Sequence, residues 1–143
     1  MRVALAEASA AASAADVPVG AVVLDAGGAI VARAHNRREA DADPTAHAEI
    51  VAIRAAARAI ASWRLDGLTL VVTLEPCTMC AGAITAARLS RLVFGAEDPR
   101  AGAVGSLWDV VRDQRQTPVP EVIGGVLGDE CLKMIRTFFS ERR

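Results

Sequence analysis

Tyrosine is absent from this sequence of 143 residues, and the other aromatic residues are scarce, with three Phe and two Trp. So few rings give little support for binding single-stranded nucleic acid by base stacking. Lys133 is the one lysine among 16 basic residues, and the formal net charge is −1. A nucleic-acid partner would therefore need a local cluster of arginines, because phosphate binding depends on clustered positive charge. Long apolar runs are missing too, and none approaches the ~20 residues that span a bilayer.

Cysteine is the next scarce residue, with three in the chain. An odd number cannot form a complete set of disulfides, and two of them form the motif Cys77-Thr78-Met79-Cys80. In a chain of this size, that pattern favours metal binding or redox chemistry in a reducing compartment. The alanine-rich N-terminus is interrupted by Glu7 and has almost no large apolar residues, so we interpret it as a helix and not as a signal peptide. We therefore expect a cytoplasmic protein.

The length fits one domain, residues 1–143, and the apolar patterning gives its elements. Helices are expected at 2–15, from 43–45 to about 61, at 78–88, at 109–114 and at 129–141. Strands are expected at 17–24, 29–34, 68–74, 91–95 and 121–126, with polar or Gly-rich loops at 35–43 and 96–107. Strands that alternate with helices after an opening hairpin predict an α/β domain, with three α/β/α layers around a five-stranded mixed sheet.

Two short motifs carry the chemistry: Pro44-Thr45-Ala46-His47-Ala48-Glu49 and Glu75-Pro76-Cys77-Thr78-Met79-Cys80. His47, Cys77 and Cys80 can supply three ligands to a tetrahedral zinc ion and leave its fourth position open, which is typical of a catalytic site. Sulfur donors favour Zn²⁺ over Mg²⁺ or Ca²⁺. Both motifs fall at expected helix starts, where the helix dipole favours the thiolate form.

Glu49 lies two residues after His47 and is left free to move protons. The two can share a pocket with the cysteines if two helices point their N-terminal ends at one metal. A redox dithiol, a degenerate site and a non-catalytic metal-binding protein are the alternative interpretations.

These motifs resemble those of the cytidine-deaminase-like superfamily, on Pro44–Glu49 and Thr73–Ala83. Further matches resemble the family of bacterial tRNA-specific adenosine deaminases. They lie at residues 17–22, 36, 43–49, 94–98, 105–110, 129–131 and 138–139. The resemblance implies a homodimer that hydrolytically deaminates the wobble adenosine of a tRNA anticodon stem-loop to inosine. It also implies the site residues: His47, Cys77 and Cys80 as zinc ligands, Glu49 as proton shuttle, Asn36 and Ala48 at the purine, Asp98 at the nucleotide backbone, and Arg142 and Arg143 at RNA phosphates.

Several features leave the substrate open. His35 stands where relatives often carry an aromatic residue. The net charge close to zero favours a deaminase of a free base such as cytosine or guanine, while the matches at 105–110 and 138–139 favour the tRNA enzyme. Cys131 is expected to be a small buried residue of the last helix and not a fourth ligand. Phe138 and Phe139 are adjacent, so they cannot both face the same core.

Overall fold

The computed structural model describes residues 1–142 and contains a five-stranded mixed sheet. The helices are α1 (Arg2–Ser13), α2 (Arg38–Asp41), α3 (Ala48–Ile60), α4 (Thr78–Ala86) and α5 (Gly128–Ser140). The strands are β1 (Gly20–Leu24), β2 (Ile30–His35), β3 (Thr69–Leu74), β4 (Arg91–Ala96) and β5 (Glu121–Ile123). Their order is β2-β1-β3-β4-β5, with β1 antiparallel to both neighbours and β3, β4 and β5 parallel. The expected α/β fold is confirmed.

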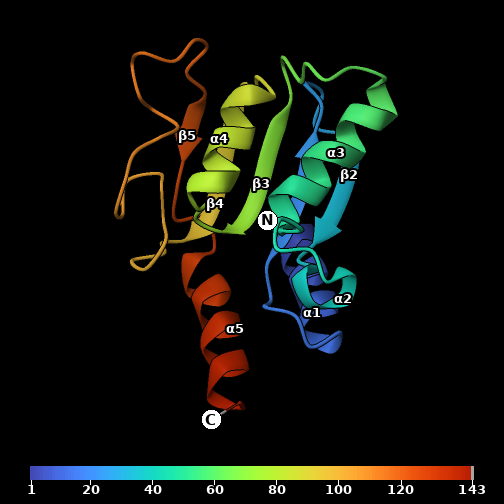
Figure 1. Cartoon of the computed structure of the whole chain (residues 1–143), viewed down its shortest axis with the longest axis vertical. Helices are drawn as coiled ribbons and strands as arrows, with labels where there is room; N and C mark the ends of the chain where they lie inside the picture. The colour runs from blue at the N-terminus through green and yellow to red at the C-terminus, as the bar shows by residue number, and fades with distance from the viewer. Residues whose placement is uncertain (143) are drawn as a thin grey trace.

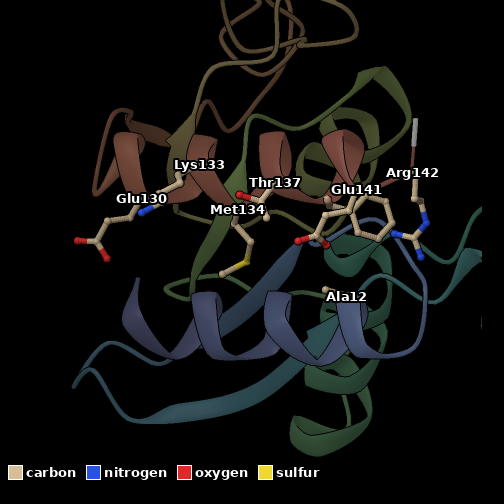
Figure 2. A pocket seen from close by; sticks show the side chains of 8 residues that line it. Ala12, Glu130, Lys133, Met134, Thr137, Glu141 and Arg142 are labelled. Carbon is tan, nitrogen blue, oxygen red and sulfur yellow. The ribbon is translucent and has the colours of Figure 1, made fainter.

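Helices cover both faces of this sheet (Figure 1). Alternate strand residues such as Val23 and Val72 pack against the alanine-rich faces of α3 and α4, while Val22 and Val71 face α1. This alternation follows from the two-residue period of a strand. Helix α5 runs beside α1 (Figure 2), and Arg2 and Glu130 form an ion pair between them at 3.0 Å. Each helical layer therefore buries one of the two apolar faces of the sheet.

The helix expected from residues 43–45 instead begins at Ala48, and this part of the sequence-based prediction is wrong. Asp43 Oδ1 accepts hydrogen bonds from the Thr45 amide at 2.8 Å and from its hydroxyl at 2.7 Å, which closes a turn. His47 has extended backbone angles and is the N-cap residue of α3. The short helix α2 also lies within the segment expected to be loop.

The short helix expected at 109–114 is also wrong. The carboxylates of Asp109 and Asp113 accept hydrogen bonds from the side chains of Arg112 and Arg115, respectively, and the segment forms successive turns. Acidic side chains that bond locally compete with helix formation in this way. Across residues 1–142, no helix is both long and apolar enough to cross a membrane.

Candidate metal centre and substrate site

Three potential metal ligands meet where two helices begin. His47 is the N-cap of α3, Cys77 is the N-cap of α4, and Cys80 lies in the first turn of α4. His47 Nδ1 is 3.7 Å from Cys77 Sγ and 3.5 Å from Cys80 Sγ, and the three atoms lie within 4.8 Å of one another. Strand β3 ends at Leu74, and the chain then continues directly to the two cysteines at the start of α4. The end-on arrangement of two helices expected from the sequence is present.

The spacing of these atoms fits a tetrahedral metal ion. Zn–S and Zn–N bonds of roughly 2.3 and 2.0 Å at the tetrahedral angle separate nitrogen from sulfur by about 3.5 Å. The two observed separations, 3.7 Å and 3.5 Å, are close to this value. The cluster can therefore bind a metal without rearrangement, and its one imidazole and two thiols are donors that zinc accepts.

Each of the two thiols shifts the pKa of the other. A hydrogen bond from Cys80 is the main cause that lowers the pKa of Cys77 to about 3, with a further contribution from His47. The same interaction and burial raise the pKa of Cys80, and the bond to Cys77 raises the pKa of His47. The lowered pKa of Cys77 favours its thiolate, which is the form that binds metal.

Glu49 lies beside this cluster in the first turn of α3. Its side chain is buried, and burial raises its pKa. A charge interaction and a hydrogen bond with Glu49 also raise the pKa of Cys80. A buried carboxyl group with a raised pKa suits proton transfer near neutral pH.

Asn36 and Ala48 approach the cluster from β2 and α3. Asn36 follows the last residue of β2 and is only 5% exposed. The next amide, that of Arg37, donates to the carbonyl of Ala46 at 2.9 Å, so the end of β2 is tied to the segment just before His47. Ala48, the first residue of α3, is fully buried. The structure thus places Ala48 directly after a candidate ligand and ties the backbone that follows Asn36 to the segment that precedes it.

Asp98 and Arg142 meet at a different place, a cavity of about 760 Å³ next to the end of β4. Arg100, Arg136 and Phe139 also line this cavity. The Asp98 carboxylate accepts the backbone amide of Arg100 at 2.9 Å, while Arg142 places its guanidinium 3.7 Å from the centre of the Phe138 ring. The last predicted contact, Arg143, lies outside the described residues.

A second groove, of about 570 Å³, runs between α1 and α5 and shares none of the candidate ligands (Figure 2). Its labelled side chains carry both charges, with Glu130 and Glu141 beside Lys133 and Arg142. Phe138 is buried and Phe139 is 46% exposed, so the two rings face different surroundings, as expected from their adjacency.

Sequence reasoning missed two buried carboxylates, Asp16 and Glu75, which are 1% and 2% exposed. Each accepts hydrogen bonds from loops that carry predicted substrate contacts. The only sequence signal for Glu75 was its place between a buried strand and the Pro76-Cys77 pair. For Asp16 there was none, since an acidic residue before an apolar strand is usually solvated.

Two other residues are now placed. His35 Nδ1 pairs with Glu7 Oε2 of α1 at 2.9 Å, so this side chain is engaged with the helix. Cys131 is buried in α5, as its sequence context predicted.

Comparison with known proteins gives concordant results. A family model described as MafB19-like deaminase matches residues 1–129. The tRNA-specific adenosine deaminase of Bacillus subtilis is 46% identical over all 143 residues, which span 88% of that protein. A solved tRNA A34 deaminase, which performs A-to-I editing at the wobble position, is 44% identical with a TM-score of 0.89 over 94% of this chain and 96% of that one. A guanine deaminase from Nitrosomonas europaea is 25% identical with a TM-score of 0.83 over 96% and 81%.

Proposed function

Because this chain belongs to the family of tRNA-specific adenosine deaminases, we propose that it hydrolyses the wobble adenosine of a tRNA anticodon stem-loop to inosine and ammonia. The observation that carries this proposal is the cluster of His47, Cys77 and Cys80 with the buried carboxyl group of Glu49 beside it. We take residues 1–143 as one deaminase domain, which works in the cytoplasm, where tRNA is present and thiols stay reduced.

Zinc is the metal that the three ligands would hold. Their separations match a tetrahedral ion, and one imidazole with two thiolates leaves its fourth position open. A bound zinc ion would supply a water molecule with a pKa near 7. A structural zinc site usually has a fourth protein ligand, and among the described residues the cluster has three.

Glu49 would handle the protons of the reaction. The carboxylate takes one proton from the attacking water and delivers it to N1 of the purine, while the water oxygen bonds to C6. Glu49 then transfers the second proton of that water to the amino group, the C6–N bond breaks, and ammonia leaves. A buried carboxyl group whose pKa is raised by burial can both accept and return a proton near neutral pH.

The substrate would be held from three sides. Asn36 and the Ala48 segment would contact the purine, since Ala48 directly follows a candidate ligand and the backbone after Asn36 is tied to the segment before that ligand. Asp98 and Arg142 would contact the nucleotide backbone and phosphates at the 760 Å³ cavity. Two further arginines line the same cavity beside the carboxylates of Glu97 and Asp98, so three guanidinium groups that can bind phosphate gather there. Arg143 would extend the same phosphate-binding surface.

A homodimer is the proposed assembly. The surface carries large apolar side chains that a protein contact would cover, namely Ile60, Trp63, Leu107 and Trp108, which are 40% to 67% exposed. Sedimentation of the purified protein over a range of concentrations tests this assembly, and a monomer at every concentration contradicts it.

The test of the activity uses an anticodon stem-loop with adenosine at the wobble position and, in parallel, free guanine and cytosine. We expect inosine in the stem-loop and no ammonia from the free bases. The fold shared with a guanine deaminase makes ammonia from guanine alone the outcome that would replace this proposal. In the same assay, Glu49→Gln should abolish turnover and leave about one zinc per chain.

A further inference from the structure

Asp16 is a buried carboxylate within the segment that joins α1 to β1, and it has no place in the chemistry described so far. Its Oδ1 accepts a hydrogen bond from the side-chain nitrogen of Asn36 at 2.9 Å. Its Oδ2 accepts the backbone amides of Glu39 at 3.0 Å and Ala40 at 3.2 Å. We propose that Asp16 is a positioning residue that fixes which end of the Asn36 amide faces the substrate. This inference rests on the proposed function.

The orientation follows from hydrogen-bond chemistry. An ionised carboxylate only accepts hydrogen bonds, so the NH₂ end of Asn36 must face Asp16, and the reverse orientation would oppose two oxygens. Among the described residues, no donor reaches Oδ1 of Asn36, and this oxygen is not sealed from solvent. Asn36 therefore presents one remaining N–H and one carbonyl oxygen to the substrate in a single fixed order. The amides of Glu39 and Ala40 hold Asp16 in place from the other side.

The position of Asn36 makes this order relevant to the reaction. The backbone amide of Asn36 donates to the Val19 carbonyl at 3.0 Å. The backbone amide of Arg37 donates to the carbonyl of Ala46, one residue before His47. The backbone at Asn36 is thus fixed, and rotation of the side-chain amide is the freedom that Asp16 removes. A fixed amide binds a purine nucleoside without first losing rotamer entropy.

Asp16→Asn is the sharpest perturbation, because it has the same shape and keeps an oxygen for Glu39 and Ala40. Its NH₂ group then faces Asn36, which must turn its own oxygen inward and reverse the order offered to the substrate. We expect KM for the stem-loop to rise about tenfold, which corresponds to the loss of about one hydrogen bond to the purine, with kcat changed less than about twofold. A merely structural defect lowers the fraction of active enzyme, and so lowers kcat without moving KM.

The matched control is Asp25→Asn. Asp25 Oδ1 accepts the amides of Gly27 and Ala29 in the β1–β2 turn and touches no asparagine, so KM should not change. In an Asn36→Ala background, Asp16→Asn should have no further effect on KM. An undiminished tenfold rise in that background would overturn the inference.

A second readout needs neither activity nor zinc. Asn36 is the one asparagine of the sequence, so asparagine-selective ¹⁵N labelling gives a single side-chain NH₂ signal. One of its two protons should exchange about tenfold more slowly than the other in the wild type, and this protection should vanish in Asp16→Ala. Equal exchange of both protons in the wild type would also overturn the inference.

These measurements separate the two claims. If the wild type deaminates guanine and not the stem-loop, the proposed function is wrong. The exchange data and the effect of Asp16→Asn on KM for guanine then still decide the role of Asp16.

Discussion

Glu75→Gln should lower the free energy of unfolding by about 3 kcal/mol, because Glu75 is the buried acceptor for the loop that follows β4. Its Oε1 accepts the amides of Val104 at 2.9 Å and Ser106 at 3.0 Å, and its Oε2 accepts the amide of Asp98 at 2.9 Å and the Ser106 hydroxyl. Burial raises the pKa of Glu75, but these four hydrogen bonds outweigh it and hold the pKa below its ordinary value. The ionised side chain is therefore the hydrogen-bond acceptor for all four of these donors.

The magnitude follows from which bonds glutamine can keep. Its oxygen can serve Val104 and Ser106, and the Ser106 hydroxyl can rotate to accept, but the new NH₂ group faces the Asp98 amide. One buried N–H without a partner costs about 1–3 kcal/mol, and the loss of charge from the two retained bonds adds about 1 kcal/mol.

The assay is urea unfolding of the zinc-loaded protein. With a slope of about 2 kcal/mol per molar urea, the midpoint should fall by about 1.5 M with the slope unchanged. The control is Glu97→Gln in the same loop, where the side chain is exposed and the midpoint should stay in place. A Glu75→Gln midpoint within about 0.3 M of wild type would refute the reasoning, since that shift corresponds to less than one ordinary hydrogen bond.

Three further predictions concern packing, RNA and metal. Gly20→Ala should destabilise the protein by about 3 kcal/mol in thermal unfolding, since its new Cβ would lie 2.0 Å from the Ala4 carbonyl oxygen of α1. Its control, Gly82→Ala in α4, meets nothing within 4 Å and should stabilise by about 0.7 kcal/mol; an equal loss in both would contradict the packing argument. Arg142→Ala should reduce the salt dependence of stem-loop binding by about 0.7 in the log–log slope, and an unchanged slope would remove this side chain from the phosphates. Cys80→Ala should reduce zinc from about one per chain to near none by elemental analysis, and full retention would mean that the thiol is not a ligand.

Much of the fold could be predicted because its signals are local. The β-branched run at residues 68–74 and the short apolar run at 91–95 form parallel neighbours in the sheet, and the alanine-rich segments form helices whose small faces pack on it. The predictions were wrong where side chains compete with the backbone. Asp43 closes a turn and delays α3 to Ala48, and the carboxylates of Asp109 and Asp113 keep their segment in turns.

The candidate metal site was predictable for a similar reason. His47, Cys77 and Cys80 belong to short motifs at helix starts, and the structure brings them within 4.8 Å of one another. Their supporting carboxylates were not predictable, because Asp16 and Glu75 make their contacts with residues 20 to 31 positions away. Nothing near them in the sequence marks such partners.

The sequence by itself determined the chemistry of the donors and the order of the elements, since residue type and hydrophobic period are properties of short segments. Only the tertiary structure decided that the side-chain amide of Asn36 is held by Asp16, and that Asp98 shares a cavity with Arg142. The physical reason is that orientation depends on packing and hydrogen bonds between segments far apart in the chain, which exist only once the sheet and its two helical layers have formed.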